Sequence, residues 1–373
     1  MKISGKNYKI NILILFMPSE IEPTLTTIES LFNNNVENTT ISILQNGGTS
    51  LQLKEKFSKI KNLKYYESKD NLGVAGGRNF LLKTDECNAS DVILFLDNDV
   101  ITPVDYVERL TTFLIHQKDA GVVGAMTADI NYSTYGIIKS FNEKGVWGGL
   151  TSHITSNEIK KELIGMNFSM RMFHMGTRHN YYYTYFSFKL IYFELFNRLL
   201  CFLRYPLDVH PELKKNLYYE KLVAEGIDKY DVSNVPGCCQ AFKKSLIDEI
   251  GYLDECFNPY GYEDVDFCIR AVKNGYTNYI DTNTWLLHGT DSRHGKRDVY
   301  IQEQNRFKCM TILSYNAFKS IRKCKVIIVK LIILNFINKL MPFSNVNSIR
   351  WIKSAMNGFK IGLKIIKEKK HND

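Results

Sequence analysis

Two carboxylates stand two positions apart at the end of an apolar run, in the segment Asp97-Asn98-Asp99. The apolar residues 92–96 before them predict a strand that is buried on both faces. In open α/β sheets, ligands bind at the carboxyl ends of such strands. Side chains alternate along an extended chain, so Asp97 and Asp99 can point the same way and hold Mg²⁺ or Mn²⁺ together with a diphosphate. A solvated turn is the alternative explanation for an isolated Asp-x-Asp.

A second candidate is the glycine-rich segment 71–79, which follows a predicted strand and contains Gly73, Gly76 and Arg78. Glycines at a strand-to-helix junction let backbone N–H groups approach a phosphate or a ribose, and Arg78 would add a cation in the first helical turn. A tight turn with close helix packing is the alternative. One helix and one strand separate this segment from Asp97, which places both at the same edge of the sheet.

A third candidate is the acidic pair Glu263-Asp264, at the amino end of a predicted helix. The helix dipole helps to keep a carboxylate ionised there, and such a carboxylate can take a proton from a hydroxyl group. A solvated first turn is also consistent with the pair. Asp266 stands four positions before Arg270 and can form an ion pair with it. His288, after the apolar residues 284–287, fits either a packed side chain or a ligand.

The elements that must position these side chains alternate over residues 1–130. Thr102, Pro103 and Asp105 supply an N-cap, a first-turn proline and a first-turn acid for a helix that ends near His116. This alternation predicts a doubly wound α/β domain with a mostly parallel sheet. Its strands are expected at residues 10–16, 40–44, 63–67, 92–96 and 121–125.

Residues 131–230 have a different character. They hold a tyrosine run at 181–183 and apolar residues at helical spacing over 190–203, which predicts a variable helical insertion. Core packing and contact with an acceptor or a membrane surface both remain open for it. The α/β pattern then resumes with a strand and turn over 232–242 and a short helix over 244–250.

The composition is that of a globular protein, with 373 residues, 45% hydrophobic and 23% charged. Eight cysteines occur without a Cys-x-x-Cys spacing, which favours a reducing compartment. The first apolar run, at residues 10–16, is too short and too soon followed by Pro18 to be a signal peptide. We therefore expect a cytoplasmic protein.

The basic charge is concentrated in the tail. Residues 319–373 hold 13 Lys or Arg and two acidic residues, so that the rest of the chain is nearly neutral, although the whole carries +9. The interrupted apolar run 326–337 is too short to span a bilayer. With Trp351 and Phe359 it predicts a basic amphipathic tail that lies on an anionic leaflet, or else a helix packed back on the domain. The tail lacks the interleaved aromatic residues of a stacking platform, so no nucleic-acid partner is expected.

Taken in order, these segments resemble a bacterial family 2 glycosyltransferase of the GT-A fold, close to the rhamnosyltransferase-like group. The resemblance covers residues 8 to about 295 apart from the insertion. It rests on segment 71–79, Asp97-Asn98-Asp99, segment 257–266 with Arg270, and His288.

The resemblance implies roles for several residues. Asp97 and Asp99 would hold the metal that bridges the donor diphosphate, and His288 would complete its shell. Asp264 would deprotonate the acceptor hydroxyl for direct displacement at the anomeric carbon, with inversion. Residues expected to position the acceptor or the sugar are Glu263, Asp266 and Tyr262.

The donor pocket carries one departure from the family pattern. Where the family places an Asp before Asn to bind the nucleotide base, this chain has Gln45-Asn46. Gln45 can both accept and donate hydrogen bonds, which leaves the base preference open. The donor-binding residues expected from the resemblance are Gln45, Asn46, Asn71, Gly73, Gly76, Arg78, Asn79 and Asn98.

The implied activity is metal-dependent transfer of a hexosyl or deoxyhexosyl group from a nucleotide-diphosphate sugar to a glycan or lipid-linked acceptor. Surface polysaccharide or glycolipid assembly at the inner face of the bacterial plasma membrane would be its setting. The expected division is a donor half (1–130), the insertion (131–230), an acceptor and catalytic half (231–300) and the tail (301–373). Two alternatives are an inactive glycosyltransferase-like module at the membrane and a haloacid-dehalogenase-like phosphatase, for which no well-placed later lysine is found.

Overall fold

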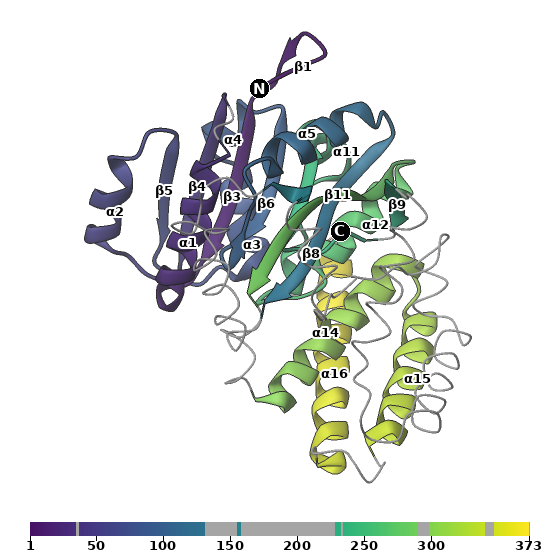
Figure 1. The fold of residues 1–373 in the computed structure, drawn as a ribbon. Coiled ribbons are helices and arrows are strands. Elements are labelled where there is room, and N and C mark those ends of the chain that lie inside the picture. Colours follow the sequence, from purple (N-terminus) through teal and green to yellow (C-terminus); the bar gives the residue numbers. More distant parts are fainter. Residues whose placement is uncertain are drawn as a thin grey trace, which may run out of the picture.

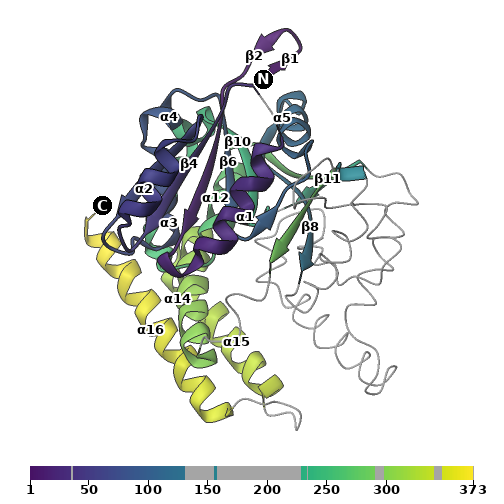
Figure 2. The same ribbon diagram turned by 60° about the vertical axis from the view of Figure 1, so that its left-hand side comes forward.

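The computed structural model describes residues 1–34, 37–130, 155–157, 228–232, 234–289, 298–339 and 347–372. The helix expected at 190–203 and the tyrosine run at 181–183 lie outside these residues. Figures 1 and 2 show a sheet domain with a group of long C-terminal helices below it.

The amino-terminal half alternates strands and helices, as its apolar runs predict. The elements are the hairpin strands β1 (Lys2–Ile3) and β2 (Lys6–Asn7), then β3 (Ile10–Phe16), η1 (Pro18–Glu20), α1 (Ile21–Phe32), β4 (Thr39–Asn46), α2 (Leu51–Ser58), β5 (Leu63–Ser68), α3 (Gly73–Leu82), α4 (Asp85–Asn88), β6 (Val92–Asp97), β7 (Val100–Ile101), α5 (Tyr106–His116) and β8 (Ala120–Ile130). All five predicted strands are present.

The second half completes the sheet and adds the long helices. Its elements are β9 (Lys229–Val232), β10 (Cys239–Lys243), α11 (Ser245–Ile250), η4 (Glu255–Phe257), α12 (Glu263–Lys273), β11 (Thr277–Gly289), α14 (Val299–Phe318), α15 (Ile321–Lys339) and α16 (Ser348–Asn372).

The large sheet has the order β5-β4-β3-β6-β10-β8-β11-β7, with β9 also paired to β11. Strands β5, β4, β3 and β6 are parallel, β10 runs antiparallel between β6 and β8, and β8 is parallel to β11. Six strands therefore share one direction. This confirms the predicted α/β class with a mostly parallel sheet.

Both faces of the sheet are covered, because its central strands are mostly apolar and carry buried apolar side chains on both sides. In β3, Leu13 faces a core shared with α3, α11 and α12, while Ile12 and Ile14 face a core shared with α1 and α5. The carboxyl ends of the parallel strands point toward the C-terminal helices (Figure 1). The site described below lies at that edge.

The helix expected to open at Thr102 begins later, at Tyr106. Thr102 instead joins the loop to α1, because its Oγ1 lies 3.1 Å from Ser30 Oγ and its backbone N–H donates to the same hydroxyl. Strand β8 is longer than expected because it pairs with β11 along most of its length.

The C-terminal helices α14, α15 and α16 form a bundle with its own core, built of Phe307, Met310, Cys324, Ile328, Leu331, Ile332, Trp351, Ala355 and Phe359. We call it the C-terminal bundle. Trp351 is 0% exposed and its ring meets Phe307 edge-on at 5.7 Å. The expectation that Trp351 and Phe359 contact a membrane is therefore wrong, since both side chains are used in packing the tail against α14.

Helix α16 approaches α14 closely at two glycines. A β-carbon at Gly358 would lie 2.0 Å from the carbonyl oxygen of Gln304, and one at Gly362 would lie 2.7 Å from Thr311 Cβ. Figure 2 shows the two helices side by side, with α16 returning toward the sheet domain. Among the described residues, none of the helices is both long and apolar enough to cross a membrane.

Candidate active site

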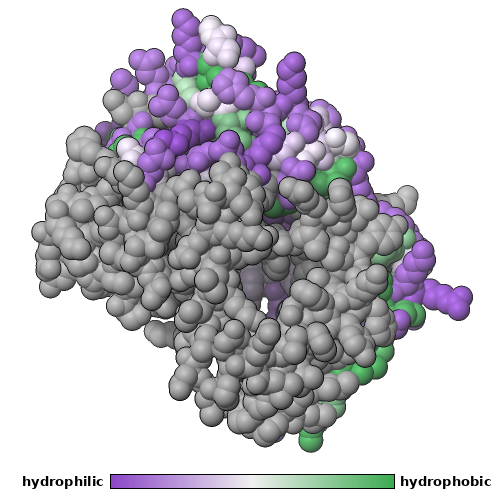
Figure 3. All heavy atoms as spheres, turned by 45° about the vertical axis from the view of Figure 1, so that its right-hand side comes forward, coloured by the Kyte–Doolittle hydropathy of each residue, from purple (hydrophilic) through white to green (hydrophobic). Residues whose placement is uncertain are grey.

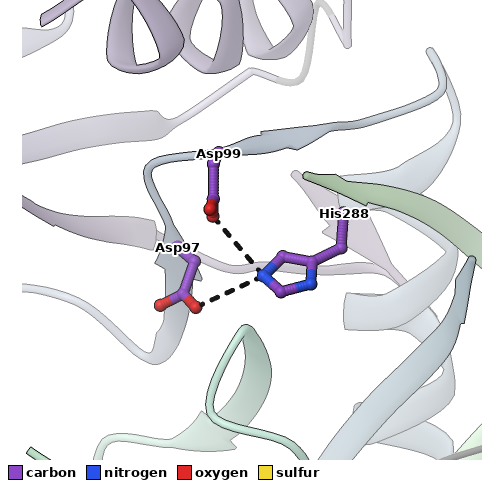
Figure 4. A group of neighbouring side chains, drawn as sticks. All are labelled: Asp97, Asp99 and His288. Atoms are coloured by element: carbon purple, nitrogen blue, oxygen red, sulfur yellow. Dashed lines mark ion pairs between the residues drawn. The ribbon is translucent and has the colours of Figure 1, made fainter. Parts of the chain in front are cut away.

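Asp97, Asp99 and His288 come together because a short strand follows the acidic turn. Asp97 ends β6, and β7 then pairs antiparallel with the end of β11, opposing Val100 to His288. The N–H of Gly289 donates to the Asp99 carbonyl over 2.7 Å. His288 Nε2 lies 3.7 Å from Asp97 Oδ2 and 3.4 Å from Asp99 Oδ1 (Figure 4).

This cluster has the chemistry of a divalent-cation site. One potential ligand atom from each of the three side chains lies within 4.8 Å of the others, and all three residues are partly exposed. Two carboxylate oxygens and an imidazole suit Mn²⁺ or Mg²⁺, and phosphate and water can complete an octahedral shell. The residues therefore fit the metal that the sequence predicted.

Arg78 is the buried cation beside these carboxylates. Its Nη2 lies 3.2 Å from Asp97 Oδ1 and donates to the Gly237 carbonyl over 2.7 Å, while its Nη1 lies 4.0 Å from Glu263 Oε1. The guanidinium also lies over the Phe95 ring, 4.8 Å from its centroid. The side chain is only 5% exposed, so the charge of Arg78 acts at close range on both Asp97, in the acidic turn, and Glu263, at the start of α12.

Glu263 and Asp264 open α12 but differ in their surroundings. Asp264 is partly exposed, and its two oxygens accept from the N–H groups of Gly237 (2.9 Å) and Val265 (2.8 Å). Glu263 is buried, and among the described residues its Oε2 has no hydrogen-bond partner. Burial and the nearby Asp264 raise the pKa of Glu263 to about 7 against the opposing pull of Arg78. Burial also raises the pKa of Asp264.

The glycine-rich segment uses its N–H groups within the protein. Gly73 donates to Asn71 Oδ1 over 2.9 Å, and the N–H groups of Ala75 and Gly76 point to Asn258 Oδ1 at 3.1 and 3.4 Å. A β-carbon at Gly73 would lie 2.4 Å from Asn258 Oδ1. The glycines thus permit close packing of α3 on the loop before α12, as the alternative explanation of this segment has it, and donor binding by Gly73 and Gly76 stays a prediction.

Gln45 and Asn46 end β4 at the same sheet edge, and both are buried. Gln45 Oε1 accepts from the Tyr65 hydroxyl over 2.8 Å. Asn46 accepts from the N–H of Leu72 over 2.8 Å and donates to Asn71 Oδ1 over 3.1 Å. Asn46 and Asn71 therefore shape the loop that leads into α3.

Two expected donor ligands point elsewhere. Asn79 donates to the Leu253 carbonyl and to Glu255, both over 2.9 Å, and accepts from the Leu253 N–H. Asn98 donates to Glu20 Oε2 and to Thr24 Oγ1, both over 3.2 Å. Both side chains are buried and connect neighbouring elements, and their roles in donor binding stay predictions.

The expected acceptor residues other than the Glu263-Asp264 pair are also occupied. Asp266 is buried and bonds Arg270 and Asn316, each over 2.9 Å. Tyr262 is the left-handed residue before α12, with φ 70°, and packs against the C-terminal bundle. Through these contacts, Asp266 and Tyr262 connect α12 to the bundle.

Two residues that the sequence did not single out complete the site. The Gly237 backbone joins Arg78, through its carbonyl, to Asp264, through its N–H. Asn258 joins α3 to the α12 loop, donating to the Leu72 carbonyl over 2.8 Å and accepting from the start of α3. Position 258 falls within the segment that carries the family resemblance, which was the available signal for it.

Comparison with known proteins bears on the fold. Residues 19–185, somewhat under half of the chain, match the model for Glycosyl transferase family 2. No curated protein matches the chain significantly. One similar solved structure is GalNAc-T7 with UDP, GalNAc and Mn²⁺, with a TM-score of 0.51 and 12% identity over 97% of this chain. Another is S. aureus TarS 1–349 with UDP-GlcNAc, with a TM-score of 0.50 and 11% identity over 95% of this chain.

These likenesses show the fold, which is the GT-A fold of nucleotide-sugar transferases. The chain spans 57% of the length of the GalNAc-T7 chain and 81% of the length of the TarS chain.

Proposed function

We propose that this chain, a GT-A protein whose residues 19–185 match glycosyl transferase family 2, transfers a sugar from a nucleotide diphosphate to an acceptor hydroxyl with inversion. The observation that carries the proposal is the meeting of Asp97, Asp99 and His288 with Arg78 and with the Glu263-Asp264 pair at one sheet edge. Charge for a diphosphate and a base for a hydroxyl are thus present together.

In the proposed reaction Asp264 takes the proton of the acceptor hydroxyl while the hydroxyl oxygen attacks the anomeric carbon. The bond from that carbon to the diphosphate breaks and its electron pair leaves with the nucleotide diphosphate. The two backbone N–H groups fix the orientation of Asp264, and its raised pKa makes it a stronger base than an ordinary aspartate. A divalent cation held by Asp97, Asp99 and His288 would supply positive charge beside the diphosphate.

A hexosyl or deoxyhexosyl donor and a glycan or lipid-linked acceptor fit this reading, in bacterial polysaccharide or glycolipid assembly. The rhamnosyltransferase-like resemblance supports a deoxyhexose, whereas the TarS structure, solved with UDP-GlcNAc, makes that nucleotide sugar a first probe. Gln45 stands where the family has an aspartate, and it accepts a hydrogen bond from Tyr65. This supports a preference for a nucleotide base different from that of the family pattern.

The test is thermal unfolding with a panel of nucleotide sugars, with and without Mn²⁺. A ligand that binds only the folded chain raises the midpoint by mass action, so one donor should protect the chain only when metal is present. Asp99→Ala should lose that protection, while Asp248→Ala, an exposed acid on α11, should keep it. Metal-dependent release of nucleotide diphosphate from the same donor would distinguish an enzyme from an inactive binding module. Protection that ignores both metal and the Asp99 substitution would contradict the metal site.

A further inference from the structure

Helix α15 has apolar residues on two sides. One side, with Cys324, Ile328, Leu331 and Ile332, is buried in the C-terminal bundle. The opposite side leaves Val326, Val329 and Ile333 exposed by 48%, 37% and 52%. Single exposed apolar residues are ordinary, but three on one helix face call for an explanation.

The spacing of these residues makes a continuous strip. At about 100° per residue, Val326, Val329 and Ile333 fall within a sector of roughly 60°, centred away from the buried side. Exposed lysines stand on both flanks of this strip, Lys323 and Lys330 on one and Lys325 on the other. We call this set of residues the α15 outer face.

The α15 outer face combines apolar residues with positive charge. Helix α15 contains no acidic residue. In Figure 3 the described surface of the sheet domain is mainly hydrophilic, while hydrophobic residues gather toward the lower right, at the height of the bundle. An apolar strip between lysines is the pattern of a helix that lies in a lipid interface, where long lysine side chains reach the headgroups.

We propose that the α15 outer face docks the protein on an anionic phospholipid surface. This proposal rests on the proposed transfer to a lipid-linked acceptor. Charge complementarity selects this occupant, because anionic headgroups attract the flanking lysines, whereas a neutral apolar partner offers them no negative charge. The bundle extends from the carboxyl-end side of the sheet, the side that carries Asp97 and His288 (Figure 1). Docking there would hold the site on the membrane side of the molecule.

The experiment is flotation of the full chain with phosphatidylcholine vesicles that do or do not contain phosphatidylglycerol. Binding should require phosphatidylglycerol and weaken in high salt, because exposed charges are screened within a Debye length. Each lysine removed near the surface should weaken binding about fivefold. A Lys325→Glu/Lys330→Glu variant and a Val326→Ser/Val329→Ser/Ile333→Ser variant should each lose flotation. All five positions are exposed, so the fold should survive.

The matched control lies on α2, which offers exposed Leu51, Lys54 and Lys56 at the far edge of the sheet domain from the bundle (Figure 1). Leu51→Ser/Lys54→Glu/Lys56→Glu should float like the unaltered chain. Equal flotation of the α15 variants, or failure of the unaltered chain to bind phosphatidylglycerol, would overturn the proposal. So would loss of a self-associated species in the same variants, by sedimentation, because the face would then be a subunit contact.

Nucleotide-sugar hydrolysis, measured in parallel without vesicles, separates this proposal from the proposed function. The α15 variants should retain it. Flotation without hydrolysis of any donor would count against the proposed function and leave the membrane face supported.

Discussion

Glu263 and Asp264 are adjacent carboxylates, of which Glu263 is buried and Asp264 is partly exposed to solvent. Asp264 is reachable and held by two backbone N–H groups, whereas Glu263 is 5% exposed and lies beside Arg78. An acceptor hydroxyl can therefore approach Asp264 more readily. Glu263 is better placed to tune Arg78 and its neighbours than to receive a proton from an acceptor.

We predict that Asp264→Asn lowers turnover by about 10²- to 10⁴-fold, the usual contribution of a general base, while donor binding persists. Single-turnover rates and calorimetric donor affinity are the measurements. Glu263→Gln, which keeps the size of its side chain, is the comparison. If Glu263→Gln is inactive and Asp264→Asn is active, the roles within the pair are reversed.

The raised pKa of Glu263 also predicts how stability depends on pH. The folded state keeps the proton between about pH 4.5 and about pH 7, where the unfolded state releases it. The free energy of unfolding should therefore fall as pH rises through this window, and the loss should be complete above it.

Glu263→Gln should remove this contribution, so its melting temperature should fall less across the window than that of the unaltered chain. Thermal unfolding in metal-free buffer at several pH values checks this. Glu55→Gln, at an exposed position of α2, should follow the unaltered chain. Parallel pH profiles for all three proteins would show that Glu263 ionises as freely as in the unfolded chain.

Sequence reasoning located the residues whose position follows from a strand end, and it missed those whose direction depends on tertiary contacts. Asp97 follows a fully apolar run, so its place at the sheet edge could be predicted. Asn79 and Asn98 lie in the right segments, but helix and turn geometry direct their side chains to Leu253 and Glu20. No local pattern encodes that choice.

At the scale of elements, a two-residue strand decides the geometry of the cluster of Asp97, Asp99 and His288. His288 lies beside Asp99 because β7 pairs with β11, two segments almost 190 residues apart in the chain. The resemblance supplied His288, whereas apolar periodicity alone could not. The same limit applies to the tail, where charge and hydropathy predicted helices but left open whether they pack or face lipid.

The close approach of α16 to α14 yields a prediction with a defined sign. Alanine is favoured over glycine in a helix by about 1 kcal/mol. At position 358, however, a methyl group would overlap the Gln304 backbone, and overpacking typically costs about 1–3 kcal/mol. Gly358→Ala should therefore destabilise the chain, as measured by urea unfolding.

Lys360→Ala, at an exposed neighbouring position of the same helix, should change stability little. A gain in stability for Gly358→Ala equal to its helix preference would mean that the two helices are further apart than the structure places them.

At the scale of the whole molecule, the tail is part of the fold. Asn305 donates to the Tyr260 carbonyl over 2.7 Å, and the buried Lys308 donates to the Asn258 carbonyl. Lys369 pairs with Asp254 over 2.9 Å. These contacts connect the bundle to residues 254–262, which lead into α12.

Removal of residues 319–373 should therefore do more than detach the protein from lipid. It would expose the apolar face of α14 around Phe307 and Met310, which α15 and α16 now cover. We predict a lower melting temperature and loss of donor hydrolysis, by calorimetry and nucleotide release. A truncated chain that melts and hydrolyses like the full chain would show that the bundle does not support the site.

The segment 254–262 packs between two helices: Asn258 bonds the start of α3, and Lys308 of α14 bonds the segment. The conformation of the segment therefore depends on both helices. A chimera that takes its tail from a related protein would consequently need a matching segment 254–262, and one that exchanges only segment 254–262 would need a matching α14. Segment 254–262 and the tail are therefore expected to change together in functional chimeras, rather than independently.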